Sequence, residues 1–396
     1  MTVKLYDDAP YETEFDAEVI SCAESADGLY DLILNRTLFF PEEGGQSPDQ
    51  GSIFTSDTGI DVLDVQIDGT HTITHKIDAF IAPGTQVHGM IDWKHRFSNM
   101  QQHTGEHIFS GIVHSRFGYD NVGFHLSDNE VTMDYNGTLT PDDLQMIEHE
   151  ANEAIVKNIK TDCRYPSADE LEKIDYRSKK EIEGAVRIVT IPGIDTCACC
   201  APHVSYTGEI GLLKVAGYQS HRGGCRIWIL CGFRAIAQFN KFQAACDVVS
   251  REYSAPVSAE AFADAIARRN DNTARMQARI SDLQGALLDM QLEKIDPASP
   301  DVTLFVDGID EVRKRNVLNE LVKTHFGYCS IFDGNDEDGY SFIIASSTQD
   351  CNVPVRTLRE KFGAKGGGKP VMVQGSVKAA QKELTQLSLL PHTFYW

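Results

Sequence analysis

The chain has 396 residues, enough for two or three domains at the usual size of roughly 100 to 200 residues each. Its formal net charge of −22 excludes a protein that coats nucleic acid over its whole surface, because phosphate binding needs concentrated Lys and Arg. No apolar run approaches the roughly 20 residues of a membrane helix, and residues 1–8 lack the pattern of a signal peptide. We therefore expect a cytoplasmic protein whose ten cysteines serve as thiols and ligands.

Residues 1–90 are predicted to form a small antiparallel β-barrel. The stretches Leu29–Leu34 and Ile60–Ile67 alternate apolar with polar side chains, and turn residues separate such runs at short intervals. Between them, Gly44 and Gly45 lie in a predicted loop, where glycine allows a ligand to approach the backbone closely. A plain turn is the alternative use of this loop.

Two residue pairs with the spacing of metal ligands follow. A long helix is predicted over 93–117, and it places His103 and His107, four residues apart, on one face. Cys199 and His203 repeat this spacing, with a proline before the histidine that favours a loop or strand. Because Zn²⁺ accepts imidazole and thiolate together, the four residues are predicted to bind zinc, in either a structural or a catalytic site. Buried thiols and chance histidines are the alternative.

Glu106 makes the motif ambiguous. His103 to His107 also matches H-x-x-E-H, in which the glutamate acts as general base of a zinc peptidase. That reading needs a downstream glutamate as third ligand, and it leaves Cys199 and His203 without a purpose. The candidates for that ligand are Glu170, Glu172 and Glu181. A solvated helix residue is the plain alternative for Glu106.

A two-layer α+β domain is predicted over 91–245. A second helix is expected to begin at Pro141, capped by Thr140. Helices mixed with strands suggest two layers. The predicted strands are 187–191, 208–215 and 226–231.

Residues 246–296 are predicted to form a helical or coiled-coil linker, with a long helix from Ser258 to Lys294. Mostly apolar residues at alternating four and three spacing form a heptad stripe on it, with weak places at Arg269 and Thr273. These residues are Ile266, Thr273, Met276, Ile280, Leu283, Leu287 and Met290. The stripe predicts either a homodimer contact through residues 262–290 or packing within one chain.

Residues 297–396 are predicted to form an α/β domain, with strands at 302–306 and 341–345 around a helix at 311–323. It ends in a predicted glycine loop over 363–370, between lysines. The surrounding residues are basic, so an RNA backbone could bind there, although a merely solvated basic surface has the same pattern.

Three motifs in this order resemble the alanyl-tRNA editing proteins of the AlaX family, freestanding relatives of the editing domain of alanyl-tRNA synthetase. The motifs are Phe39–Gln46, Met100–His107 and Cys199–Gly211, and residues 366–375 are similar to the C-terminal domain of that synthetase. The resemblance implies hydrolysis of the ester between tRNA for alanine and a wrong amino acid, usually serine and sometimes glycine.

The resemblance also implies roles for individual residues. The zinc ligands would be His103, His107, Cys199 and His203. The amino-acid pocket would contain Thr37, Gly44, Gly45 and Gln46. Apart from the resemblance, Gln46 and Glu106 are the residues predicted to act in hydrolysis, Glu106 because of the H-x-x-E-H motif. The tRNA would contact Lys361, Lys365, Gly366, Gly367, Gly368 and Lys369.

The chain departs from the family pattern at two places. Cys200, Ala201 and Pro202 replace a flexible loop, and Glu106 replaces a small residue. Cys199 is favoured over Cys200 as the ligand because of its spacing. An RNA-binding module with a structural zinc is the non-enzymatic alternative.

Overall fold

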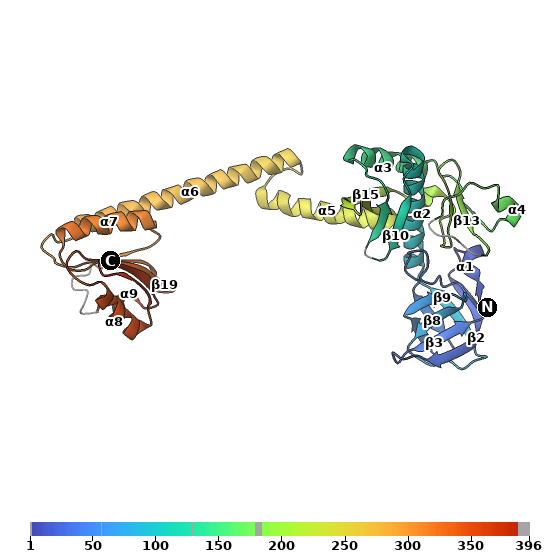
Figure 1. Cartoon of the computed structure of the whole chain (residues 1–396), viewed down its shortest axis with the longest axis horizontal. Helices are drawn as coiled ribbons and strands as arrows, with labels where there is room; N and C mark the ends of the chain where they lie inside the picture. Colours follow the sequence, from blue (N-terminus) through green and yellow to red (C-terminus); the bar gives the residue numbers. More distant parts are fainter. Residues whose placement is uncertain (1, 57, 129, 179–183, 387–396) are drawn as a thin grey trace. The chain divides into compact units, whose positions relative to one another are not determined.

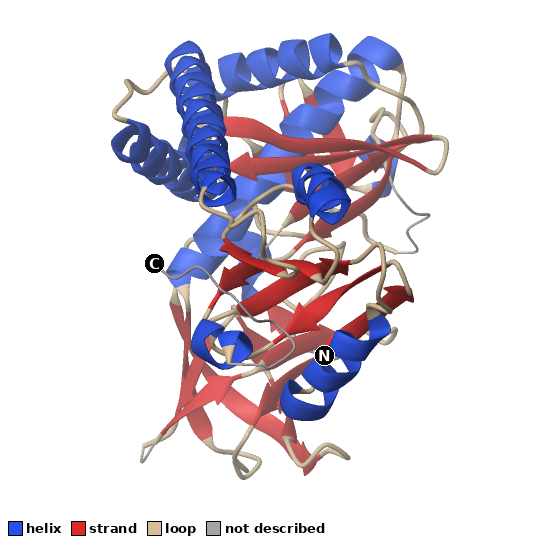
Figure 2. Cartoon of the chain, turned by 90° about the vertical axis from the view of Figure 1, so that its left-hand side faces the viewer, coloured by secondary structure: helices blue, strands red, loops and turns tan. Residues whose placement is uncertain are grey.

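The computed structural model describes residues 2–56, 58–128, 130–178 and 184–386 (Figure 1). The chain divides into two compact units, Met1–Ala245 and Cys246–Trp396, and each is described by itself. Both contain helices and strands (Figure 2), which confirms the predicted α+β class. Among the described helices, none is both long and apolar enough to cross a membrane.

The first unit begins with a sheet of seven strands that is nearly closed. β6 and β7 are consecutive in the chain but lie at opposite ends of the strand order, so the sheet curves back on itself. In spatial order the strands are β6 (Gly59–Val62), β5 (Gly51–Phe54), β9 (Gln86–Ile91), β2 (Glu14–Glu24), β3 (Tyr30–Leu34), β8 (Ile73–Ile77) and β7 (Asp64–Ile67). Alternate side chains of these strands fill an apolar core, as the predicted period of two requires.

The prediction of one strand over Ile60–Ile67 was wrong, because the chain changes partner at Leu63. Before this residue β6 pairs with β5, and after it β7 pairs with β8. Leu63 itself is exposed, and its N–H donates to the carbonyl of Lys76. The alternating pattern continues through the change, so it gives no sign of the break.

His75 on β8 makes the stability of this sheet depend on pH. Burial lowers the pKa of His75 from 6.5 to about 4, and the hydrogen bond to the Leu32 carbonyl opposes this only in part. His75 takes up a proton near pH 6.5 in the unfolded chain but not in the folded chain. Its contribution to the free energy of unfolding is therefore complete above pH 6.5 and is lost as the pH falls toward 4. At about 1.4 kcal/mol per pKa unit, we expect the free energy of unfolding, measured with urea, to be about 3 kcal/mol lower at pH 4 than above pH 6.5. His75→Gln should remove this part of the pH dependence, and an unchanged profile would contradict the assignment.

Helix α2 (Trp93–Phe117) is the centre of the first unit. It begins at Asp92, whose side chain accepts from the N–H of His95, and it ends at Gly118, which has a left-handed φ of 69°. Every residue from Asn99 to Val113 is buried, so α2 has no solvent-facing side along this length.

Two sheets and several helices surround α2. The four-stranded sheet consists of β10 (Asn121–Leu126), β11 (Val131–Tyr135), β16 (Gly224–Cys231) and β15 (Leu213–His221), in that order. The three-stranded sheet consists of β12 (Asp162–Arg164), β13 (Ile188–Ile191) and β14 (Asp195–Ala198). The remaining elements are β1 (Val3–Lys4) paired with β4 (Arg36–Thr37), α1 (Leu5–Asp8), α3 (Pro141–Val156), α4 (Ala168–Leu171) and the 3-10 helix η1 (Thr207–Ile210). The predicted cap of α3 is confirmed, because the Thr140 hydroxyl accepts from the N–H of Asp143.

The predicted strand over 208–215 was wrong in its first half. That part is η1, and β15 begins only at Leu213. The Thr207 hydroxyl donates to the carbonyl of Ala154 on α3, and Gly211 has a φ of 81°, which a strand residue does not adopt. The sequence reasoning also missed α5 (Gly232–Tyr253).

The second unit contains a five-stranded sheet whose first pair is parallel and whose other pairs are antiparallel. Its order is β17 (Val302–Val306), β18 (Cys329–Asn335), β19 (Gly339–Ala345), β21 (Met372–Val377) and β20 (Lys365–Lys369). Its helices are α6 (Ala259–Glu293), α7 (Glu311–Thr324), α8 (Asn352–Phe362) and α9 (Gln381–Thr385).

The predicted glycine loop over 363–370 is instead the edge strand β20. A Cβ at Gly366 would lie 2.4 Å from the carbonyl oxygen of Gln374, and one at Gly368 would lie 2.5 Å from that of Met372. The glycines therefore let two strands approach closely, which the sequence pattern does not distinguish from a loop. All residues of β20 are exposed.

Helix α6 carries the predicted heptad stripe on its exposed surface. Met276 is 66% exposed and Ile280 is 51% exposed, so this surface has little cover within the described chain. The homodimer through 262–290 stays a prediction. We expect Met276→Glu with Ile280→Glu to convert a dimer into a monomer in sedimentation equilibrium, whereas Gln277→Glu should not. A wild-type chain that is monomeric throughout would contradict it.

Candidate metal centre

The buried polar side chains of α2 reach several other parts of the first unit. The side-chain amide of Gln102 forms two hydrogen bonds with the backbone of Cys231 on β16: Nε2 donates to the carbonyl, and Oε1 accepts from the N–H. Gly105 allows this contact, because a Cβ there would lie 2.3 Å from Sγ of Cys231. The carbonyl of Glu209 accepts from the side chain of Gln101. These contacts fix the rotation of α2 and hence the direction of its two histidines.

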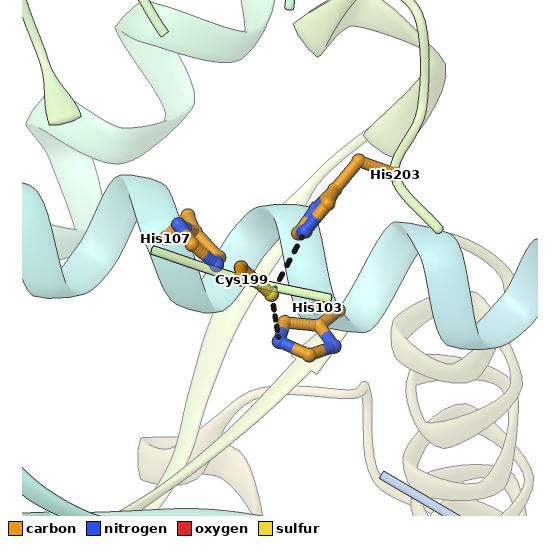
Figure 3. A group of neighbouring side chains, drawn as sticks. All are labelled: His103, His107, Cys199 and His203. Atoms are coloured by element: carbon orange, nitrogen blue, oxygen red, sulfur yellow. Dashed lines mark hydrogen bonds between the residues drawn. The ribbon is translucent and has the colours of Figure 1, made fainter. Parts of the chain in front are cut away.

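The structure brings His103 and His107 together with Cys199 and His203 (Figure 3). One potential ligand atom from each of the four residues lies within 4.8 Å of all the others. Sγ of Cys199 lies 3.5 Å from Nε2 of His103 and 3.3 Å from Nε2 of His203. Cys199 directly follows β14, and His203 lies on the loop beyond it, in agreement with the expected loop or strand.

The far ring nitrogen of each histidine has an oxygen partner. Nδ1 lies 2.8 Å from Oε1 of Gln46 for His103, 2.9 Å from Oδ2 of Asp195 for His107, and 3.1 Å from Oγ1 of Thr104 for His203. A proton on each Nδ1 satisfies all three oxygens and leaves each Nε2 free to bind a metal. Histidines that bind metals regularly donate their second N–H in this way. The donor set therefore fits Zn²⁺.

The charges in the group also suit a cation. Burial opposes ionisation of the Cys199 thiol, but the imidazoles of His103 and His203 outweigh it and hold the pKa of Cys199 well below its usual value. Burial lowers the pKa of His203 to about 3, whereas at His107 burial is outweighed by Asp195 and Cys199, which hold its pKa well above the usual value. A thiolate and neutral imidazoles are the forms in which these side chains bind metals.

Two arginines, Arg187 buried and Arg177 partly buried, hold the segments that supply the ligands. Arg187 donates to the carbonyls of Cys199 and Ala201, at 3.1 and 2.8 Å, and so fixes the loop between Cys199 and His203. Arg177 forms a bidentate pair with Asp195, at 2.8 and 2.9 Å. A cavity of about 470 Å³ lies beside His203 and Arg187.

The loop of Gly44 and Gly45 lies against the ligand segments. Both glycines have positive φ, and a Cβ at Gly45 would lie 2.3 Å from the carbonyl oxygen of Phe124. A Cβ at Gly44 would lie 3.4 Å from Sγ of Cys200. The loop thereby directs Gln46 to His103.

Glu106 is buried beside the group, not solvated. Its Oε1 accepts from the Ser110 hydroxyl and from the side-chain amide of Asn121, both at 2.6 Å. Its Oε2 lies 3.9 Å from Nε2 of His107. Among the described residues, the peptidase alternative has no glutamate as third ligand, since the group of four contains neither Glu170 nor Glu172. Glu181 lies outside the described residues.

Thr37 is wholly buried in the first unit. Its hydroxyl lies 2.9 Å from Nε2 of His75 and accepts from the N–H of Phe39. If it donates to His75, one lone pair of Thr37 is left for another partner. The residues predicted to contact tRNA are all in the second unit, where β20 presents Lys365 and Lys369 to solvent.

Sequence reasoning missed Thr104, Arg177, Arg187 and Asp195. Thr104 lies inside the recognised motif, so its place next to His103 was a usable signal. The other three come from segments with no ligand-like spacing, and only the fold brings them to the site.

Comparisons with known proteins agree with this arrangement. Residues 7–95 match the model of class II (A) tRNA synthetases, and residues 186–227 match that of the second additional domain of threonyl and alanyl tRNA synthetases. The second match contains Cys199 and His203.

Individual relatives cover more of the chain. It is 26% identical to the alanyl-tRNA editing protein AlaX-L of Pyrococcus horikoshii over 98% of both chains. It is 28% identical to the alanine–tRNA ligase of Methanoculleus marisnigri over 95% of this chain and 41% of that protein. It is 31% identical to the alanyl-tRNA editing protein Aarsd1 of Bos taurus over 53% of this chain and 50% of that protein. The chain thus spans less than half of the ligase.

Proposed function

The chain belongs to the family of alanyl-tRNA editing proteins. From this we propose that it hydrolyses the ester bond between tRNA for alanine and a wrongly attached amino acid. Serine is the proposed main substrate and glycine a second one. The observation that carries the proposal is the group of three imidazoles and one thiol, joined through His103 to Gln46 on the loop with paired glycines.

The proposed zinc ligands are His103, His107, Cys199 and His203. Bound there, Zn²⁺ would polarise or position the ester. An aminoacyl ester is already activated, so the protein needs chiefly to orient water and stabilise the oxyanion.

The chain's own residues would take three roles in this reaction. The Nε2 of Gln46, which has no hydrogen-bond partner among the described residues, would donate to the ester carbonyl as it gains charge. Glu106, held by Ser110 and Asn121, would accept the proton of the attacking water at Oε2. The remaining lone pair of Thr37 would accept from the hydroxyl of serine, which alanine lacks.

Release of serine from seryl-tRNA for alanine tests the proposal, with alanyl-tRNA as the substrate to be spared. Metal-stripped protein is the control. Equal rates with and without the metal would overturn it. Gln46→Ala and Glu106→Ala should each lower the rate, and full activity in both would favour an RNA-binding module with structural zinc. Cleavage of peptides would favour the H-x-x-E-H alternative.

The tRNA contact is proposed for the basic edge of the second unit, around Lys361, Lys365 and Lys369, together with Gly366, Gly367 and Gly368. The support is that β20 is exposed and has cations at both ends. Lys365→Ala with Lys369→Ala should raise KM for seryl-tRNA, leave kcat unchanged, and reduce the salt dependence of binding by a slope of about 2. Lys323→Ala, which removes an exposed lysine paired with Glu320, is the matched control. An unchanged salt slope would contradict this contact.

A further inference from the structure

Buried polar atoms without partners gather on the turn that carries Gln46. Among the described residues, Oε2 of Glu43, Nε2 of Gln46 and Oγ of Ser47 are buried and have no hydrogen-bond partner. Glu43 and Gln46 are the ends of one turn, closed by the hydrogen bond from the N–H of Gln46 to the carbonyl of Glu43 at 3.1 Å, and Ser47 follows directly. Buried polar groups in proteins are nearly always paired. The turn therefore has the features of a site that a polar ligand completes.

Glu43 faces two further groups at this site. Burial raises the pKa of Cys200 and of Tyr6, and the carboxylate of Glu43 raises both further. The Tyr6 hydroxyl is also buried, and it too lacks a partner within the described chain. Cys200 is the neighbour of Cys199, and a Cβ at Gly44, next to Glu43, would lie 3.4 Å from its Sγ, so the turn lies beside the metal centre.

The charges at this turn favour a cationic ligand. Asp7 acts on Tyr6 together with Glu43, so two carboxylates share the region. Arg187 is the nearby cation; it donates to the carbonyls of Cys199 and Ala201 and pairs with Asp7 at 3.9 Å, so among the described residues Glu43 is the carboxylate left without a cation. A ligand group with a positive charge and several N–H donors would satisfy Oε2 of Glu43, whose carboxylate also accepts from the Cys200 thiol.

We propose that Glu43 binds the α-ammonium group of the aminoacyl ester, and that Gln46 on the same turn binds its carbonyl oxygen. The ammonium and the carbonyl are on adjacent carbon atoms, so the ligand needs an acceptor and a donor from neighbouring positions, and this turn supplies both. Glu43 would thereby distinguish an aminoacyl end with a free amine from one with a blocked amine. This inference rests on the proposed function.

The test compares seryl-tRNA with N-acetyl-seryl-tRNA as substrates, because acetylation removes the positive charge and leaves the ester. The wild-type chain should prefer the free amine by roughly 10- to 100-fold in kcat/KM, the usual value of a hydrogen bond to a charged group. Glu43→Gln should abolish this preference by lowering only the rate on seryl-tRNA. Glu42→Gln is the matched control, since Glu42 is exposed and accepts from Gln66 instead.

Binding of non-hydrolysable 3′-serylamido-adenosine, free or N-acetylated, gives a second measurement that does not depend on turnover. The wild type should prefer the free amine, and Glu43→Gln should bind both forms equally while it keeps its zinc. A preference that survives in Glu43→Gln, or an equal loss on both esters, would overturn the role of Glu43. A wild-type chain that hydrolyses neither ester would overturn the proposed function instead.

Discussion

Replacing Cys199 by alanine is expected to abolish zinc binding and to lower deacylation by at least about 100-fold. The physical reason is that Sγ of Cys199 lies within 3.5 Å of two of the three imidazoles and supplies the only negative charge of the four. Removing even a group that is only hydrogen-bonded to a metal ligand lowers metal affinity or activity by about 10- to 100-fold, and Cys199 is itself a proposed ligand. Zinc content after dialysis and the rate on seryl-tRNA are the measurements.

Two further variants sharpen this experiment. Cys200→Ala should keep the zinc, because Cys199 and not its neighbour contacts the imidazoles. Cys22→Ala, on β2, should keep both zinc and activity. Zinc retained in Cys199→Ala would support the peptidase alternative, in which this thiol has no role.

Arg96→Met is expected to lower the free energy of unfolding of the first unit by about 3–5 kcal/mol, the usual cost of breaking a buried ion pair. Nε of Arg96 lies 3.0 Å from both carboxylate oxygens of Asp49, and the guanidinium also donates to the carbonyls of Pro10 and Leu38. Both side chains are wholly buried. The substitution leaves the carboxylate of Asp49 without its counter-charge in the protein interior.

Urea unfolding followed by circular dichroism measures the effect. Arg116→Met is the control on the same helix: its pair with Glu150 is exposed, so the loss should be below about 1 kcal/mol. Arg96→Met combined with Asp49→Leu should recover part of the loss, because the unpaired charge is then gone. Equal losses of unfolding free energy for Arg96→Met and Arg116→Met would show that the buried pair stabilises the first unit no more than the exposed pair does.

Local spacing explains which features the sequence predicts. The histidines on α2 are four residues apart, and an i, i+4 relation is fixed by the helix itself. The same holds for Thr140 and Asp143 at the start of α3. Such features depend on neighbours in the chain, so a periodic pattern is enough to find them.

Features that depend on distant partners were not predictable in this way. Leu63 keeps the alternation of a strand while the chain changes to another partner. The glycines of β20 are required by a neighbouring strand, yet they resemble a loop. Asp195 reaches His107 only because β14 packs against α2. Its role is set by tertiary contacts and not by a motif.

The burial of α2 from Asn99 to Val113 has a consequence for the order of folding. Its polar side chains have partners on segments as far apart as Gln46 and Cys231, so α2 alone cannot satisfy them. Contacts between residues distant in the chain form late, because the intervening loops must close first. The metal-binding group therefore matures only when the whole first unit has folded. A fragment that begins at residue 91 lacks the partners of His103 and Arg96 and should neither fold cooperatively nor retain zinc.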